Sequence, residues 1–236
     1  MMFEIPPRVK NIIKLLDKLN IKECEKYLDL GCGDGYYTYI IGQKIRCKEI
    51  LGVDISRERL SYAEKGGIKT YLIDLNIEKL PIIDNSIDVI TALEVIEHLI
   101  NPDNMLREAY RVLKIGGYLI ISTPNLASYI NRILLLFGFQ PTYSEVSTMF
   151  EIPRRHCKKD ESAKWHRPSG NLRLYTLKAL KCLLEIYNFE IVAVRGSTST
   201  YNIPKWMRIM DEIIGKIFPS LSRIIIIVAR KVADTS

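Results

Sequence analysis

The residues of this chain best suited to binding chemistry lie in one stretch, 27–35, which reads YLDLGCGDG. An apolar run ends in Asp29, and three glycines follow at alternate positions: Gly31, Gly33 and Gly35. Glycine has no Cβ, so such a loop turns sharply and lets a ligand approach its backbone N–H groups. In α/β proteins, a strand that ends, turns on glycines and starts a helix builds a nucleotide site. The N-terminus of that helix favours negative charge.

The glycine spacing separates two kinds of nucleotide site. Dinucleotide-binding enzymes carry G-x-G-x-x-G, whereas this chain reads G-x-G-x-G and has Tyr36 where the third glycine would stand. The dehydrogenase pattern therefore fails at one of its three glycines. Because the two folds overlap, an NAD-dependent oxidoreductase and a non-catalytic nucleotide-binding protein stay open as alternatives.

Five segments, in order along residues 25–125, resemble the motifs of class I S-adenosylmethionine-dependent methyltransferases. The first is Asp29-x-Gly31-x-Gly33-x-Gly35, and the segments that follow are 52–56, 73–75, 84–90 and 108–117. One glycine motif alone would be weak support, but five in order at ordinary loop spacings are specific. The chain is identified on these residues as a member of that class, of methyltransferase domain type 11 or 23.

The resemblance implies a role for each acidic strand end. Asp29 would hold the methionine ammonium of S-adenosylmethionine, directly or through water. Asp54, about 20 residues past the glycines, would meet the ribose hydroxyls. Asp74 would accept a hydrogen bond from the adenine amino group, with Leu75 beside the ring. The other residues expected at the cofactor are Ile55 and Leu93. The competing interpretation is that these aspartates only end strands or cap turns.

A second constellation, LEVIEH, follows the predicted strand 87–92. If the segment is helical, Glu94, Glu97 and His98 fall on one face at i, i+3 and i+4. Two carboxylates and an imidazole can bind Mg²⁺, Mn²⁺ or Zn²⁺. Glu-x-x-Glu-His resembles the metal-binding element of two methyltransferase groups, those of ubiquinone synthesis and those that methylate the 2′-hydroxyl of small RNAs. In both, the cation would position the acceptor oxygens and ease their deprotonation.

The metal hypothesis lacks one expected ligand. Related sequences place Gly-His-x-Arg before the next helix, whereas this chain has Asn171 in place of that histidine. Nothing in the sequence places His156 or His166 as a substitute. His98 as a metal-free general base, assisted by Glu97, is therefore the competing catalytic hypothesis, and a solvated helix end is the non-functional one.

Alternating apolar strands and amphipathic helices predict a mostly parallel sheet covered on both faces. The family resemblance implies a Rossmann-like fold of seven strands, the last antiparallel. We expect a single methyltransferase domain over residues 1–236, with a cofactor-binding core at 25–125 and acceptor cap segments at 126–175 and 196–221.

The chain has 236 residues, of which 47% are hydrophobic, and a formal net charge of +7. It shows no apolar run long enough to span a membrane and no signal-peptide pattern at its start. The five cysteines, Cys24, Cys32, Cys47, Cys157 and Cys182, lack metal-site spacing. We expect free thiols in a reducing cytoplasm.

The sequence says least about the methyl acceptor. We expect an oxygen of a small metabolite, lipid precursor or sugar; an RNA ribose 2′-hydroxyl is the alternative, disfavoured by modest basicity. The basic cluster 154–159 would clamp an anionic acceptor or form an exposed loop. For the amphipathic segment 203–218 we expect core packing, with membrane contact or a lid as the alternative. The apolar run 133–139 would line an acceptor pocket or a homodimer interface.

Overall fold

The structure is a computed structural model, and it describes residues 5–148, 170–198 and 205–233. One seven-stranded sheet runs through it in the order β3-β2-β1-β4-β5-β7-β6. Only β7 runs antiparallel to its neighbours β5 and β6, so the predicted seven strands and the antiparallel last strand are confirmed. The strands are β1 (Cys24–Leu30), β2 (Cys47–Asp54), β3 (Lys69–Leu72), β4 (Ile87–Leu93), β5 (Leu113–Pro124), β6 (Phe189–Ser197) and β7 (Ile224–Lys231).

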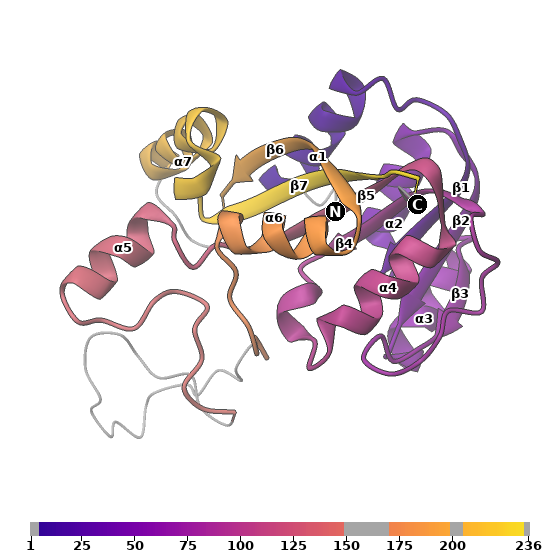
Figure 1. The fold of residues 1–236 in the computed structure, drawn as a ribbon, viewed down its shortest axis with the longest axis horizontal. Helices are drawn as coiled ribbons and strands as arrows, with labels where there is room; N and C mark the ends of the chain where they lie inside the picture. Colours follow the sequence, from indigo (N-terminus) through magenta and orange to yellow (C-terminus); the bar gives the residue numbers. More distant parts are fainter. Residues whose placement is uncertain (1–4, 149–169, 199–204, 234–236) are drawn as a thin grey trace.

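Helices cover both faces of this sheet (Figure 1). The α-helices are α1 (Pro7–Lys18), α2 (Tyr36–Lys44), α3 (Arg57–Lys65), α4 (Pro102–Val112), α5 (Tyr129–Leu136), α6 (Leu177–Ile186) and α7 (Lys205–Ile217), with short 3₁₀ helices η1 (Ile96–His98) and η2 (Pro219–Leu221). Helices α1 and α2 pack with Tyr27 and Val89 in one apolar cluster. Helices α4 and α6 pack with Leu28 and Leu30 in the other. Alternate residues of β1 thus face opposite layers, as strand geometry requires.

Several helices begin at a residue whose side chain caps the first turn. The side chains of Ser56, Asn101 and Thr176 each accept a hydrogen bond from the backbone N–H three residues on. Such a bond satisfies one of the donors that a helix leaves without a partner at its start. These caps fix where α3, α4 and α6 begin.

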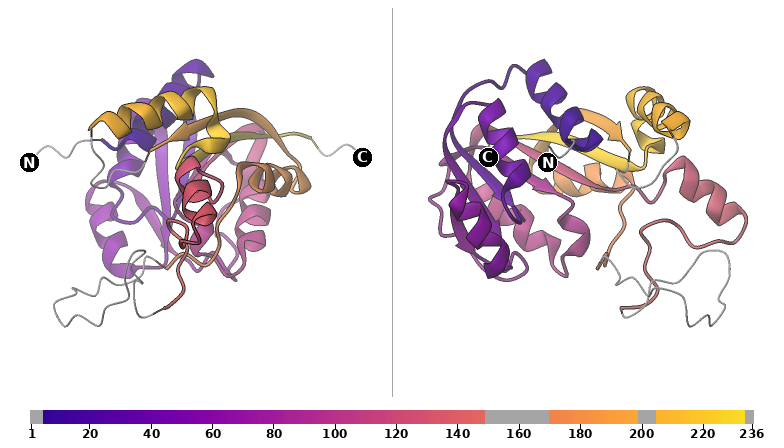
Figure 2. Two further views of the ribbon diagram at one scale, coloured as in Figure 1. Left: turned by 90° about the vertical axis from the view of Figure 1, so that its left-hand side faces the viewer. Right: turned by 180° about the vertical axis from the view of Figure 1, so that it is seen from behind.

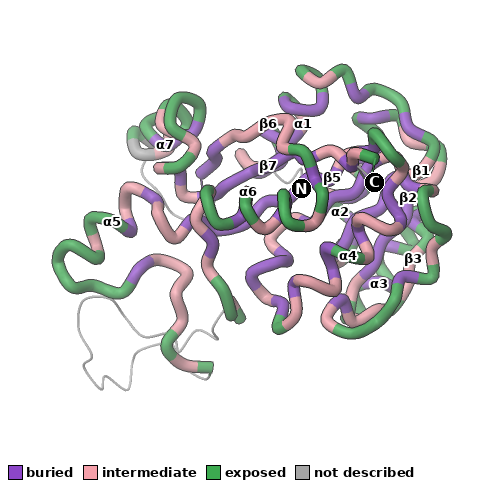
Figure 3. The backbone as a smooth tube through the Cα atoms, viewed as in Figure 1, coloured by how far each residue is buried: buried purple, intermediate pink, exposed green. Residues whose placement is uncertain are grey.

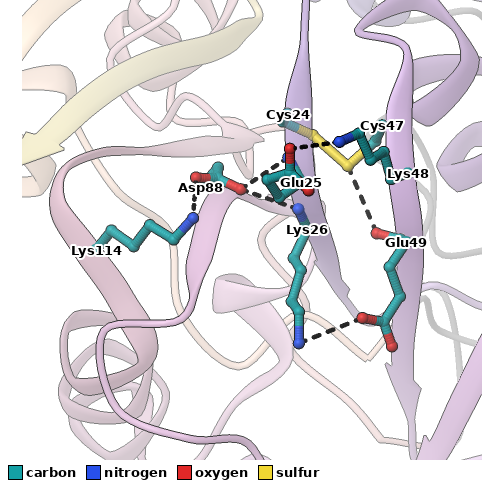
Figure 4. Close-up of a disulfide and its surroundings, with 8 residues drawn as sticks. All are labelled: Cys24, Glu25, Lys26, Cys47, Lys48, Glu49, Asp88 and Lys114. Carbon is teal, nitrogen blue, oxygen red and sulfur yellow. Dashed lines mark hydrogen bonds and ion pairs between the residues drawn. A yellow bond between two sulfur atoms is a disulfide. The ribbon is translucent and has the colours of Figure 1, made fainter.

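Cys24 and Cys47 form a disulfide, so the expectation of free thiols is wrong for this pair (Figure 4). The two residues are directly opposite each other at the start of the parallel strands β1 and β2. A separation of 23 residues hides this pairing in the sequence, because only the strand register brings the two Cα atoms to 4.6 Å. Cys32 and Cys182 are free, and Cys157 lies outside the described residues. The cysteine argument for a reducing compartment therefore loses its support.

Helix α7 does not pack its apolar side into the core, and that expectation is wrong as well. Trp206, Ile209, Ile213 and Ile217 are all more than half exposed. In Figure 3 this helix and α5 are largely coloured as exposed. Across the described ranges, no helix is both long and apolar enough to cross a membrane.

Candidate active site

The glycine loop after β1 adopts a conformation that its three glycines explain. Gly31, Gly33 and Gly35 have φ of +76°, +56° and +81°, in the left-handed region that residues with a Cβ rarely enter. Two of them also lack room for a side chain. A Cβ on Gly31 would lie 2.4 Å from a Val95 methyl, and one on Gly35 would lie 2.5 Å from Ile68. The sequence motif is thus a steric requirement of this turn.

The loop is closed onto the end of β2 by its own backbone donors. The N–H groups of Gly31 and Cys32 donate to the Val53 carbonyl, at 2.7 and 2.9 Å. The Gly33 N–H donates to the Asp54 carboxylate at 2.9 Å. These three donors are engaged inside the protein. The predicted use of the loop's N–H groups for an anion therefore does not extend to them.

Asp29 lies beneath the loop in a hydroxyl network, with 4% of its surface exposed. Its two carboxylate oxygens accept hydrogen bonds from Thr38 and Thr91, each at 2.5 Å. The Tyr27 hydroxyl in turn lies 2.6 Å from the Thr91 hydroxyl. Burial raises the pKa of Asp29 to about 6, against the lowering effect of the two threonine bonds. Each oxygen keeps a second lone pair, so Asp29 can accept further donors.

Asp54 ends β2 as predicted and organises the same edge of the sheet. Besides the Gly33 bond, its other oxygen accepts from the Ser56 N–H at 2.8 Å. Neighbouring Cys32 is a free thiol. Burial, followed by the charges of Asp29 and Asp54, raises its pKa far above the ordinary range. The thiol therefore stays protonated and is a poor nucleophile at neutral pH.

The remaining residues predicted at the cofactor are spread over different environments. Asp74 follows β3 and accepts from the backbone and side-chain nitrogens of Asn76, at 2.9 and 2.7 Å. Leu75 is buried in the core cluster of α4 and α6. Ile55 is 69% exposed, and Leu93 packs partly buried against the opposite cluster. Their contact with a cofactor stays a prediction.

Glu94, Glu97 and His98 do not share a helical face, which corrects the geometry expected from their spacing. Only Ile96–His98 is helical, and it is 3₁₀. Glu94 precedes it with φ +57°. The glutamates bond to different partners on β5: Ser122 donates to Glu94 at 2.8 Å, and Thr123 donates to Glu97 at 2.9 Å.

These side chains do not fit a divalent cation. Among the residues that the structure describes, no group of three histidine, cysteine, aspartate or glutamate side chains could hold a metal ion. The reason is local, because Glu97 turns into the protein toward Thr123 while His98 bonds to the Gly170 carbonyl. The metal hypothesis rested on a helix that does not form here. His156 and His166, the substitutes considered for the missing ligand, lie outside the described residues.

Glu97 is a buried acid at the carboxyl end of β4, with 1% of its surface exposed. Burial and the nearby Glu94 carboxylate raise its pKa to about 8, against the lowering effect of the Thr123 bond. Burial also raises the pKa of Glu94, against the opposing charge of Arg8, whose Nη1 lies 3.8 Å from the Glu94 carboxylate. Glu97 therefore keeps its proton near neutral pH, and the pair carries less than two negative charges.

The contact of His98 determines which of its ring nitrogens carries a proton. Nδ1 lies 3.0 Å from the Gly170 carbonyl oxygen, and a carbonyl only accepts. The neutral ring therefore has its proton on Nδ1 and a lone pair on Nε2. The backbone of the same loop is held as well, because the N–H groups of Leu172 and Arg173 donate to the Glu97 carbonyl at 2.8 and 3.0 Å.

Comparison with known proteins agrees with this architecture. Residues 28–121 match the model of the methyltransferase domain family. A probable S-adenosylmethionine-dependent methyltransferase of Mycobacterium tuberculosis is 34% identical over 98 residues. That match covers 42% of this chain and 35% of the relative, so the chain spans about a third of that relative's length.

Two other matches extend over more of the chain. A demethylmenaquinone methyltransferase of Geobacillus is 27% identical over 66% of this chain and 74% of that protein. The crystal structure of a S-adenosylmethionine-dependent methyltransferase from Methanosarcina mazei superposes with a TM-score of 0.63, at 20% identity, over 98% of this chain and all of that one. Residues 28–121 thus resemble a methyltransferase domain, and the chain shares its fold with a S-adenosylmethionine-dependent methyltransferase.

Two residues near the Glu94–His98 segment were not singled out by sequence reasoning. Arg8 of α1 reaches Glu94, stacks over the Tyr37 ring at 5.5 Å and has a buried Nε without a hydrogen bond in the described structure. Tyr175 has a buried hydroxyl that likewise lacks a partner there. Both lie outside the family motifs, and only their burial reveals them. Each is a buried donor free to bind a ligand.

Proposed function

We propose that this chain binds S-adenosylmethionine at the carboxyl edge of β1, β2 and β3 and transfers its methyl group to a small acceptor. The observation that carries the proposal is the loop of three left-handed glycines closed onto Asp54. Asp54 uses one lone pair on each oxygen for the loop and for Ser56. Its remaining lone pairs are acceptors suited to ribose hydroxyls.

The sulfonium of S-adenosylmethionine supplies an already activated methyl group, so the protein has mainly to orient the acceptor and exclude side reactions. The protonated state of the Cys32 thiol helps to exclude side reactions, because a thiolate in this loop would compete with the acceptor for the activated methyl group. Asp29, buried under the loop, keeps a free lone pair for the methionine ammonium. These features support binding of a cationic nucleoside rather than a dinucleotide.

For the acceptor we propose an oxygen of a small molecule, such as a metabolite, lipid precursor or sugar, with His98 as general base. The Gly170 carbonyl fixes the Nδ1–H tautomer and leaves Nε2 free to accept a hydroxyl proton. Glu97 would then act as a neutral hydrogen-bond donor and not as a second base. RNA as acceptor has no supporting contact among the described residues. The basic cluster 154–159 lies outside them.

Calorimetric titration tests the cofactor. S-adenosylmethionine should bind and NAD should not. Asp54→Asn should weaken S-adenosylmethionine binding about 10- to 100-fold, since hydrogen bonds to a charged acceptor are worth about 1.5–3 kcal/mol. Asp17→Asn, an exposed site on α1, is the matched control and should bind as the wild type does. Binding of NAD with none of the sulfonium compound would refute the proposal.

One replacement of His98 separates its contact with Gly170 from its role as a base. In His98→Asn the side-chain amide can still donate to the Gly170 carbonyl but has no Nε2 base. The kcat should fall about 10²- to 10⁴-fold with little change in S-adenosylmethionine affinity. The acceptor is sought by incubating the enzyme and a radiolabelled methyl donor with lipid, polar-metabolite and RNA fractions of an extract. Label found only in RNA would contradict the small-molecule acceptor, and unchanged kcat in His98→Asn would contradict the base.

A further inference from the structure

Helix α7 carries an apolar stripe on its outer side. Trp206, Ile209, Ile213 and Ile217 are 62%, 53%, 55% and 60% exposed. Their spacing of three and four residues places them along one side of the helix. Soluble proteins normally turn such a stripe toward their core, so its exposure requires an explanation.

A polar anchor holds α7 in this inverted orientation. Asp211, on its inner side, is 1% exposed. It accepts hydrogen bonds from Tyr129 at 2.7 Å and Thr198 at 2.6 Å, and Arg223 lies 2.8 Å away in an ion pair. Rotating the helix to bury its stripe would separate this carboxylate from all three partners, and a buried carboxylate without partners is strongly unfavourable.

Close backbone packing fixes the same orientation. A Cβ on Gly196 of β6 would lie 2.5 Å from the Gly215 Cα on α7. Only glycine at these two positions lets the helix approach the strand so closely. The outward stripe is thus built by two independent contacts on the inner side of the helix.

Helix α5 extends this apolar surface. The Tyr129–Asp211 bond joins α5 to α7, and Figures 1 and 2 show both helices at the end of the molecule away from β3 and α3. Ile133, Leu136 and Phe137 are 51%, 80% and 69% exposed. We call the exposed apolar residues of these two helices the α5–α7 face.

The charges around the α5–α7 face are mainly positive. Residues 126–144 contain no aspartate or glutamate, and Arg132 is exposed there. On α7, Lys216 is exposed and Glu212 is the acidic residue left outside, since Asp211 is buried with Arg223. The whole chain carries +7. Self-association through this face would bring two positively charged surfaces together, which disfavours a second copy as the occupant.

We infer that the α5–α7 face rests on the surface of an anionic lipid bilayer. An amphipathic helix with tryptophan and isoleucine on one side and basic residues at its margins suits the bilayer interface, where tryptophan is favoured. Basic side chains near the surface add an attraction to anionic headgroups. This goes beyond methyl transfer, because it needs neither cofactor nor acceptor.

The placement of the face makes the contact useful to the enzyme. Helix α5 begins five residues after the end of β5, and Leu126 in that connection is bonded to Tyr175. Tyr175 follows Leu172 and Arg173, whose backbone N–H groups donate to the Glu97 carbonyl. The face and the proposed acceptor site therefore occupy the same end of the sheet.

Flotation of the purified full chain with vesicles tests the inference. The protein should float with phosphatidylcholine vesicles that contain phosphatidylglycerol, less with phosphatidylcholine alone, and less again as salt rises. Ile213→Glu should lower the partition coefficient about tenfold or more. Ile115→Glu, equally an exposed isoleucine but near the start of β5, is the matched control and should float as the wild type does. Thermal melts show whether each variant is folded.

Three results would overturn the inference. One is failure of the wild type to float with either vesicle. Another is an equal loss for Ile213→Glu and Ile115→Glu in folded protein. The third is a stable dimer in solution that Ile213→Glu dissociates while vesicle binding is absent, which would assign the face to a second copy. Should Ile213→Glu fail to fold, Ile209→Glu repeats the comparison on the same stripe. Cofactor titration of the same samples is independent of these outcomes, so a failure here leaves the proposed function standing.

Discussion

Replacing Glu97 by glutamine should make the protein more stable at alkaline pH and change little at acidic pH. Glu97 is buried and bonded to Thr123, and its pKa is raised to about 8. Glutamine keeps the shape and the hydrogen-bonding capacity of the protonated acid and has no charge to bury. The substitution therefore imitates the form that the native state prefers.

The magnitude follows from the difference in pKa between folded and unfolded chains. An unfolded glutamate releases its proton near pH 4.5, whereas native Glu97 holds it to about 8. Between these values the native state binds the extra proton, so the free energy of unfolding falls as pH rises. At 1.36 kcal/mol per pKa unit the whole loss is about 5 kcal/mol. Glu94 shares the titration, so we expect about 2–5 kcal/mol to separate wild type and variant at pH 8.5.

The assay is urea unfolding of both proteins at pH 5 and pH 8.5, where the midpoint and the slope give the free energy of unfolding. The Glu97→Gln advantage should grow from near zero at pH 5 to its full value at pH 8.5. Glu185→Gln, at an exposed site on α6, should show no such growth. If the Glu97→Gln difference is the same at both pH values, Glu97 is not a proton-holding acid and the reasoning fails.

Three further outcomes are expected. Gly35→Ala should lower the free energy of unfolding by about 2 kcal/mol or more, because it combines left-handed backbone strain with a steric clash. Gly138→Ala, at φ +73° with nothing within 4 Å of an added Cβ, should lose only the part that comes from strain. Equal losses in thermal melts would contradict the clash. Cys47→Ser should lower the free energy of unfolding by about 2–4 kcal/mol in oxidised protein and by far less in reductant. Cys182→Ser is the control. A loss that is the same in reductant would mean that the disulfide is not its cause. Thr38→Val removes a hydrogen-bond donor from the buried Asp29 carboxylate and should lower the free energy of unfolding by about 1–3 kcal/mol. Denaturation at pH 5, where Asp29 takes up a proton, should show a smaller loss.

Local chemistry made the cofactor half of the fold predictable. Glycines with φ near +80° and capping residues such as Ser56 leave a mark at a fixed position in the sequence. Strand periodicity indicated the mostly parallel sheet, and the family resemblance implied its seven strands with the last one antiparallel. The same local reasoning failed at Glu94–His98, because apolar and acidic residues at helical spacing are equally compatible with a strand end followed by one 3₁₀ turn.

Long-range pairing was not predictable. The Cys24–Cys47 bond depends on the register of two strands, and the contact between Arg8 and Glu94 joins residues 86 positions apart. The outward stripe of α7 depends on Asp211, whose three partners lie on other elements. A hydrophobic pattern shows which residues share a side of a helix. Contacts with residues distant in the sequence, such as those of Asp211, decide which side of the helix is buried.

The position of the Cys24–Cys47 bond has a consequence for how the molecule opens. It ties β2 to β1 at the amino edge, and β2 in turn pairs with the outermost strand β3. Without the disulfide, we expect β2, α3 and β3 to unfold together while the rest of the protein stays folded. With it, amide hydrogens of β2 should exchange only through complete unfolding. Reduction should convert them to faster, partial exchange that releases the strand carrying Asp54.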